Sequence, residues 1–306
     1  MTSPPVSTSA LFDSAFLAKL EQLHLLARRM FRGDRRAERR TRQAGASLEF
    51  ADYREYTPGD EPRSIDWHAY GRLDRLFVKL YEHEQDLPVT FLVDCSASMS
   101  WLPEEKADVL TKFDHARRLC AALAYIALAN LDRVNIHFFA ANSLAELGVA
   151  RGKSGFHSVL KFLGAPPQPD GPTRLMQGVQ SLVQRAHRRG LVFVLSDFFD
   201  PRGYEEPLSL LLHSQFEVHV LQVLAPEELA PVAVGDLSLR DIEGGDAMDI
   251  TANENLLRRY REEITKFNAA LESFCLRRGI ASARVTTDTP FEDTVLRALR
   301  DGVMIR

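Results

Sequence analysis

The sequence VTFLVDCSASM occupies residues 89–99 and decides the fold class. Its first five residues form a short apolar run, typical of a buried parallel strand, and small polar residues follow at once. Similar apolar runs recur downstream, at residues 134–140, 191–195, 216–224 and 281–286. Stretches with helical spacing separate them, and this alternation predicts crossover connections. We therefore expect an α/β fold with a doubly wound, mainly parallel sheet flanked by helices.

The chain before this sheet has a different character. Apolar residues at helical spacing over residues 11–31 predict one amphipathic helix that runs into an Arg-rich segment. A Thr-Pro-Gly-Asp turn at residues 57–60 and an alternating run at 76–81 predict a small β-rich element. We therefore divide the chain into three parts: residues 1–44 with the helix and the Arg-rich segment, residues 45–86 as the β-rich segment, and residues 87–306 as the α/β domain with a C-terminal extension.

Composition narrows the protein class. Of 306 residues, 45% are hydrophobic and 26% are charged, which is ordinary for a soluble globular protein and excludes disordered and fibrous classes. The longest uncharged stretches are shorter than a membrane span, and residues 2–9 do not resemble a signal peptide. Cys95, Cys120 and Cys275 lie far apart and form no metal-binding pair. We expect a cytoplasmic protein without a membrane span.

The net charge of −4 conceals a local asymmetry. Residues 28–42 hold eight Arg against two acids, whereas residues 46–86 are acidic. A basic block can contact nucleic acid or an anionic membrane, but it can also be a solvated helix end or dock onto the acidic stretch that follows. No aromatic residues are interleaved for base stacking, so we expect no nucleic-acid partner.

Polar residues follow two predicted strands at the point where each strand ends. Asp94, Ser96 and Ser98 come after the first strand, Asp197 follows a later one, and Thr173 opens a helix on the same edge. Because carboxyl ends of parallel strands meet at one edge, we expect these five side chains to share a site. Their oxygens suit Mg²⁺, with Mn²⁺ or Ca²⁺ as substitutes. Two carboxylates leave such an ion short of ligands, so an acidic group of another molecule can complete its coordination.

Each of these residues also has an ordinary structural interpretation. Ser96, Ser98 or Thr173 could cap the helix that follows it, and Asp197 could form a loop turn. A scaffold protein without metal would require Asp94 and Asp197 to point apart. The gathering of all five residues at strand ends favours a shared site.

The same acids allow an enzyme interpretation, a Mg²⁺-dependent phosphatase or phosphotransferase in which Asp94 accepts the phosphoryl group. A haloacid-dehalogenase-like enzyme would need a second Asp where Ser96 stands, and no nearby Lys fills its remaining role. The run GVARGKS at residues 148–154 lacks the spacing of a P-loop, and we expect a surface turn there. Hydrolase and metalloprotease motifs are also missing, so we expect no enzyme.

The pattern Asp94-x-Ser96-x-Ser98, with a distant Thr173 and a later Asp197, resembles the metal-ion-dependent adhesion site of von Willebrand factor A-type domains. The resemblance covers roughly residues 87–224. It implies that these residues surround a divalent metal and that the ligand protein supplies a carboxylate. We expect Ser96 and Ser98 to ligate directly and the two Asp residues to act partly through water.

A second resemblance covers more of the chain. The run LEFADYREYTPGDEPRSIDW at residues 48–67 resembles the signature of the domain of unknown function 58 family. Val78-Lys79, Glu82-x-Glu84, Asp241-x-Glu243 and the run TTDTPF at residues 286–291 also fit. Many relatives carry two transmembrane helices ahead of the signature, so this chain resembles a soluble subtype. The resemblance implies association with a MoxR-type AAA+ ATPase and a role as adaptor or co-chaperone.

The signature also predicts contacts of its own. Three arginines alternate with three aspartates, which favours an ion-pair lattice that fixes the loops: Arg54, Arg63 and Arg72 with Asp52, Asp60 and Asp66. We expect Tyr56 and Trp67 to anchor these loops to the core. The alternative is a docking surface centred on Trp67 and an Arg.

Overall fold

The computed structural model describes residues 11–30, 40–44, 49–84, 87–101, 109–141, 144–186, 188–231, 235–244 and 247–300. The chain divides into two compact units, one made of Met1–Ala27 and Leu87–Met304, the other of Arg28–Asp86 and Ile305–Arg306. This division groups residues 40–44 with the signature strands, whereas the division drawn from the sequence groups them with the N-terminal helix.

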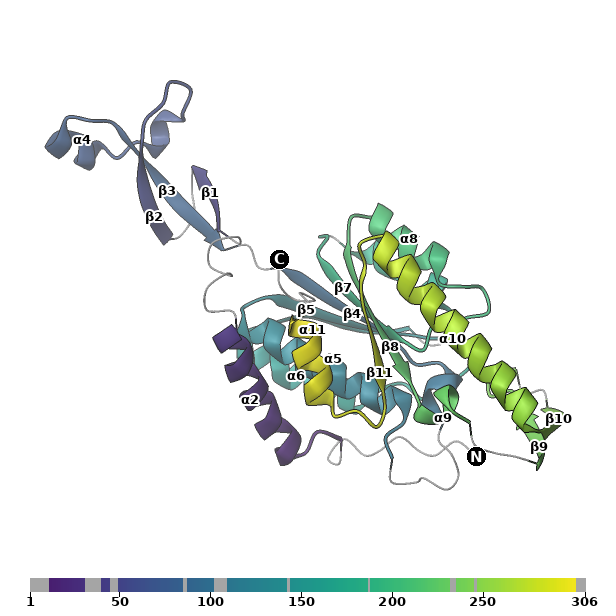
Figure 1. The fold of residues 1–306 in the computed structure, drawn as a ribbon. Coiled ribbons are helices and arrows are strands. Elements are labelled where there is room, and N and C mark those ends of the chain that lie inside the picture. Colours follow the sequence, from purple (N-terminus) through teal and green to yellow (C-terminus); the bar gives the residue numbers. More distant parts are fainter. Residues whose placement is uncertain are drawn as a thin grey trace. The chain divides into compact units, whose positions relative to one another are not determined.

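A six-stranded sheet organises the larger unit, in the order β11-β8-β7-β4-β5-β6 (Figure 1). Its strands are β4 (Pro88–Asp94), β5 (Arg133–Phe139), β6 (Leu144–Arg151), β7 (Leu191–Ser196), β8 (Glu217–Leu224) and β11 (Ala281–Thr286). Neighbouring strands pair in parallel except β5 with β6. The predicted α/β class with a mainly parallel sheet is therefore confirmed.

Strand β4 lies at the centre because it is apolar on both faces. Its residues from Val89 to Asp94 are buried, and the ring of Phe91 stacks on Phe193 of β7 with centroids 5.1 Å apart. The chain runs from β4 to β5 on one side and later returns to β7 on the other. The carboxyl end of β4 is thus the point where the strand order reverses, which is where open α/β sheets bind ligands.

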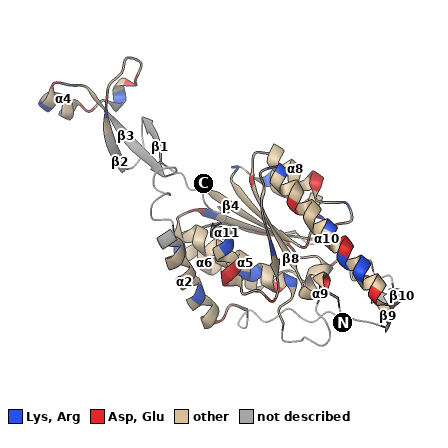
Figure 2. Ribbon diagram, in the orientation of Figure 1, with Lys and Arg blue, Asp and Glu red and all other residues tan. Residues whose placement is uncertain are grey.

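Helices cover both faces of this sheet (Figure 1). On one face, α5 (Lys112–Ala129) packs with α6 (Gly152–Gly164) and α11 (Phe291–Arg300). On the other, α7 (Leu175–Arg185), α8 (Glu205–His213) and α10 (Glu254–Arg277) share one apolar core with the strands. Figure 2 shows charges of both signs along α10, as expected of a helix with one solvated face.

The predicted N-terminal helix is present as α2 (Ser14–Met30). Phe16, Leu20 and Leu23 are buried along one side. The ring of Phe16 lies 4.8 Å from that of Phe291 in α11. The helix therefore belongs to the core of the larger unit. Residues 31–39 of the Arg-rich segment and the tail at residues 1–9 lie outside the described residues.

The smaller unit holds a three-stranded antiparallel sheet in the order β1-β3-β2, which confirms the predicted small β-rich element. Its elements are β1 (Arg40–Ala44), β2 (Glu49–Glu55), η1 (Pro62–Ser64), α4 (Trp67–Leu73) and β3 (Phe77–Glu84). The predicted turn at residues 57–60 is closed by a hydrogen bond from Asp60 N to Thr57 O.

One predicted ion pair of the signature is present, and Asp66 has an additional structural role. Arg54 pairs with Asp60 at 2.7 Å, but Asp66 instead caps α4 by accepting hydrogen bonds from two backbone amides and also accepts one from Tyr53 Oη. This cap begins a helix that the sequence did not predict, and Trp67 at its first position is 63% exposed. Trp67 therefore anchors no loop to the core.

Two further stretches differ from expectation. Residues 148–154 form the end of β6 and the start of α6, so the predicted surface turn is wrong. The section after β8 contains α9 (Pro226–Leu229) and an antiparallel hairpin of β9 (Gly235–Arg240) and β10 (Ala247–Ala252). Within the described residues, no helix is long and apolar enough to cross a membrane.

Candidate metal centre

The two predicted aspartates lie at the ends of neighbouring central strands. Asp94 is the last residue of β4, and Asp197 directly follows β7, which pairs with β4. Both are fully buried. The chain after β4 is fixed by backbone hydrogen bonds from Cys95 N to Phe139 O and from Ala97 N to Gly171 O. The turn out of the strand is therefore held in place by the loops on both sides.

Hydrogen bonds join four of the five predicted residues. Ser96 N donates to Asp94 Oδ1 at 2.9 Å, and Ser96 Oγ lies 3.1 Å from Ser98 Oγ. Ser98 Oγ donates to Asp197 Oδ2 at 3.0 Å. Asp94 and Asp197 therefore do not point apart, as a scaffold without a shared site would require.

Thr173 is buried in the loop that Ala97 contacts at Gly171, but its hydroxyl has another partner. Thr173 Oγ1 donates to Glu243 Oε1 at 3.0 Å. Thr173 does not cap the following helix, because the N-cap residue of α7 is Arg174. The hydrogen bonds that join the other four predicted residues therefore do not include the Thr173 hydroxyl.

The structure adds a lysine that the sequence analysis missed. Lys112 Nζ donates to Asp197 Oδ2 at 2.8 Å and also to Glu228 Oε1 of α9, and the side chain is 1% exposed. Burial alone would lower the pKa of Lys112, but Asp197 and Glu228 outweigh burial and raise it, so the amine stays protonated. The sequence analysis found no nearby lysine to fill a role beside these acids, whereas Lys112 lies in direct contact with Asp197. The sequence holds no distinct signal for this role, because Lys112 opens a helix whose first two turns also carry Asp114, His115, Arg117 and Arg118.

Asp94 is held by a second residue whose role the sequence analysis did not assign. Ser196 Oγ donates to Asp94 Oδ2 at 2.6 Å, so both carboxylate oxygens accept a hydrogen bond from the protein. Burial, and then the charge of Asp197, raise the pKa of Asp94 well above its ordinary value. Ionising Asp94 in the free protein is therefore unfavourable, and a cation beside it would favour the ionised carboxylate.

The donor set fits a divalent cation in charge. Asp94, Asp197 and Glu228 present three carboxylates against the single ammonium of Lys112. When all three are ionised, two negative charges remain without a partner in a buried place, which is costly. One divalent ion would balance them.

The donor set also fits in spacing. Adjacent ligands of an octahedral ion with bonds of about 2.1 Å lie about 3.0 Å apart. The two serine hydroxyls are separated by 3.1 Å, and Ser98 Oγ is 3.0 Å from Asp197 Oδ2; these are hydrogen-bond lengths that adjacent ligands of one ion would also keep. Among the described residues, no group of three or more His, Cys, Asp or Glu side chains could hold a metal ion. A cation here would therefore depend on hydroxyl ligands.

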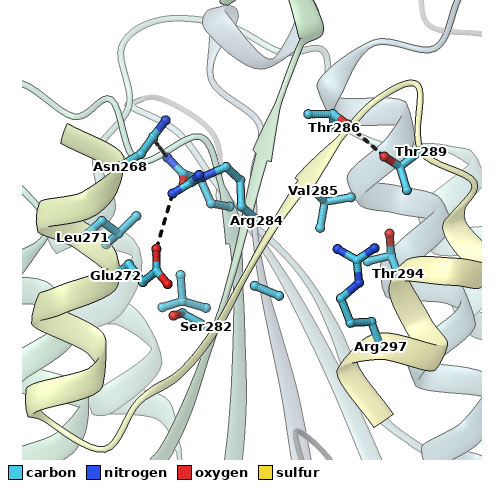
Figure 3. Close-up of a pocket in the computed structure, with 13 residues that line it drawn as sticks. Asn268, Leu271, Glu272, Ser282, Arg284, Val285, Thr286, Thr289, Thr294 and Arg297 are labelled. Atoms are coloured by element: carbon cyan, nitrogen blue, oxygen red, sulfur yellow. Dashed lines mark hydrogen bonds and ion pairs between the residues drawn. The ribbon is translucent and has the colours of Figure 1, made fainter. Parts of the chain in front are cut away.

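A separate hollow of about 460 Å³ lies along β11, between α10 and α11 (Figure 3). Asn268 and Glu272 line it from α10, and Arg297 lines it from α11. Gln222 links this hollow to the candidate centre, because its Nε2 donates to Asn268 Oδ1 at 2.9 Å and to the backbone oxygen of Asp197 at 3.4 Å. The polar floor of the hollow thus supports the loop that carries Asp197.

Comparisons with known proteins place the chain in a family. It is 25% identical over 235 residues to the Uncharacterized protein Mb1516 of Mycobacterium bovis and to the Uncharacterized protein Rv1480 of Mycobacterium tuberculosis, covering 76% of this chain and 73% of each relative. Among solved structures, it is similar to the conserved hypothetical protein BatB from Bacteroides thetaiotaomicron, with 19% identity, a TM-score of 0.43, and coverage of 70% of this chain and 96% of that one. The family described as "Protein of unknown function DUF58" matches residues 52–270, well over half of the chain, and the protein therefore belongs to this family, as its signature predicted.

Proposed function

We propose that this protein is a metal-dependent protein-interaction module of the von Willebrand factor A type. Its loop Asp94-x-Ser96-x-Ser98, together with Thr173 and Asp197, would hold Mg²⁺, with Mn²⁺ or Ca²⁺ as substitutes, and a partner's acidic side chain would complete the coordination. The observation that carries this proposal is the set of hydroxyl and carboxylate oxygens 3.0–3.1 Å apart beside buried, incompletely compensated carboxylates.

Each residue has a distinct part in this proposal. Ser96 and Ser98 would ligate the ion directly, because their hydroxyls are the close pair in the cluster. Asp94 is held by Ser96 N and Ser196 Oγ, so it supplies charge and orients the loop. Lys112 shares Asp197 with Ser98 and keeps part of that carboxylate's charge balanced before any ion binds.

The geometry supports binding over phosphoryl transfer. A phosphoryl-accepting Asp94 would need an oxygen open to substrate, yet the residue is fully buried and both of its oxygens are hydrogen-bonded. A phosphotransferase could use Lys112 to bind the phosphoryl group, but the Lys112 amine already donates hydrogen bonds to Asp197 and Glu228. We therefore propose an interaction protein, with the phosphotransferase as the alternative that a generic phosphatase assay would detect.

The proposed partner is a MoxR-type AAA+ ATPase, which the family resemblance implies, with the protein acting as its adaptor or co-chaperone. We further propose a cytoplasmic location. Its support is that Cys95, Cys120 and Cys275 are free and buried, as suits a reducing compartment.

Calorimetric titration with Mg²⁺ and Mn²⁺ tests the metal site. Asp94→Ala should abolish binding because it removes one of the buried charges that the ion balances, while circular dichroism should remain that of the folded protein. Asp249→Ala is the matched control, because it removes an exposed carboxylate on the β9–β10 hairpin. Wild-type affinity in Asp94→Ala, or no binding by the wild type, would show that the assignment is wrong.

A further inference from the structure

One edge of the six-stranded sheet is open to a further strand. Strand β11 is the last in the order β11-β8-β7-β4-β5-β6, and among the described residues only β8 pairs with it. The backbone groups of an edge strand that face away from the sheet can pair with another chain. We propose that β11 binds an extended, acidic segment of a partner protein as an added strand, at a surface separate from the candidate metal centre.

The register of β11 shows which of its residues offer backbone groups outward. Thr286 lies opposite Leu224 of β8, and Thr287 N donates to the backbone oxygen of that same Leu224 at 3.0 Å. In a parallel ladder this assigns the odd-numbered residues of β11 to pairing with β8, so the N–H and C=O groups of Ser282 and Arg284 point away from the sheet. Both residues are exposed. They therefore present donors and acceptors to a new strand.

Strand β11 lacks most of the features that protect an edge strand. Its sequence, ASARVT, contains no proline and a single charge, and its register with β8 runs from Ala281 to Thr286 without a bulge. At the opposite edge of the sheet, by contrast, the pairing of β6 with β5 shifts register between Val134 and Ile136. A regular, uninterrupted edge is suited to strand addition.

The hollow of about 460 Å³ along β11 gives an added strand room for its side chains (Figure 3). Because side chains alternate along a strand, those of an added strand would point in turn toward α10 and toward α11. Asn268 and Glu272 line the hollow from α10, and Thr294 and Arg297 line it from α11. In strand addition, backbone hydrogen bonds supply affinity, and pockets for alternate side chains supply specificity.

The charges in the hollow favour an acidic segment. Arg284 already has partners, since its Nη2 lies 3.8 Å from Glu272 Oε2 and its Nε donates to Gln222 Oε1 at 3.2 Å. Arg297 is exposed and forms no ion pair with any residue that the structure describes. A carboxylate that points from the added strand toward α11 would therefore meet an uncompensated guanidinium, which is a strong partner for it.

A second copy of this chain fits the edge less well. Antiparallel pairing of two β11 strands through their outward groups would bring the two Arg284 side chains close together on one face of the new sheet. Like charges on neighbouring strands destabilise such a pair. An acidic segment of a different protein is therefore the better occupant.

A displayed library of random eight-residue peptides, selected on the full chain in EDTA, is the probe. The recovered peptides should carry Asp or Glu among residues that favour strands. Ser282→Pro should weaken the binding of a recovered peptide about ten-fold or more, because it removes an outward N–H. Ser282→Ala keeps that N–H and should bind like the wild type. Arg297→Glu should weaken binding about ten-fold, and changing the peptide's acid to Lys should restore it.

Hydrogen exchange tests the open edge without any substitution. In the free protein, the amides of Ser282 and Arg284 should exchange faster than those of Ala283 and Val285, which face β8. The peptide should slow the first two about ten-fold or more and leave the other two unchanged. If the first two amides are already protected in the free protein, the edge is occupied and the proposed docking is refuted; a dimer in sedimentation would then identify a second copy as the occupant.

The remaining outcomes separate this inference from the proposed metal site. Recovery of no acidic peptide, or equal binding by Ser282→Pro and Ser282→Ala, would refute strand addition at β11. Equal binding by Arg297→Glu and the wild type would refute the role of charge. Because the selection contains no divalent metal, Asp94→Ala should bind the peptide like the wild type even if it loses Mg²⁺. A peptide that Asp94→Ala no longer binds would place its docking at the metal centre instead.

Discussion

At the residue scale, the candidate centre combines a local sequence motif with residues that are distant in sequence. Asp94, Ser96 and Ser98 are close in sequence, so their clustering follows from a strand end and a turn. Lys112 and Glu228 approach Asp197 from two different helices. No local pattern predicts that approach, because it depends on how α5 and α9 pack over the edge of the sheet.

His115 allows a prediction about pH at this scale. It is 2% exposed, and burial, followed by the charge of Arg118, lowers its pKa to about 4 despite the opposing effect of Asp288. The folded state thus favours the neutral ring. The stability that His115 retains is fully present above the pKa of the unfolded chain, about 6.5, and it is lost as pH falls toward 4. The wild type should lose roughly 3 kcal/mol more unfolding free energy than His115→Leu between pH 7 and pH 4. Urea denaturation at both pH values measures this, and parallel losses in the two proteins would contradict it.

At the element scale, the close approach of α7 to β5 depends on a glycine. A Cβ at Gly178 would lie 2.8 Å from the Cβ and Cγ atoms of Phe139. Gly178→Ala should therefore force the helix away and cost about 1–3 kcal/mol in stability. Gly148→Ala is the control, because a Cβ there meets nothing within 4 Å. Equal melting temperatures for the two variants would show that the helix adjusts freely.

The elements differ in how far the sequence could predict them. The central strands were predictable because burial on both faces makes them continuously apolar, as in β4 and β7. Strand β6 was not, since its sequence LAELGVAR, at the sheet edge, is neither continuously apolar nor regularly alternating. Helix α4 has seven residues and depends on its Asp66 cap, which leaves too short a pattern to detect. In β10 the residues from Ala247 to Thr251 are exposed or half-buried and only Ala252 is buried, so this strand has no apolar run to give it a signal.

At the scale of the whole molecule, the site joins distant parts of one chain. Asp94 ends β4, Asp197 follows β7, Lys112 begins α5, and Glu228 lies in α9. A pattern of strand ends predicted the first two, because parallel strands share a carboxyl edge. The contributions of the two helices depend on tertiary packing, which has no periodicity in sequence.

The partner is predicted at this same scale. If a MoxR-type AAA+ ATPase binds through the metal centre, it should co-purify with the tagged protein in Mg²⁺ and be identified by mass spectrometry. A chelator should release it, but chelation also strips the Mg²⁺ of the ATPase's own nucleotide. Asp94→Ala in Mg²⁺ is therefore the decisive arm, since it should lose the ATPase while the nucleotide remains intact, and Asp249→Ala should retain it. If the ATPase stays bound to Asp94→Ala, it docks elsewhere on the molecule. If the wild type recovers no ATPase, the proposed partner is wrong for this chain.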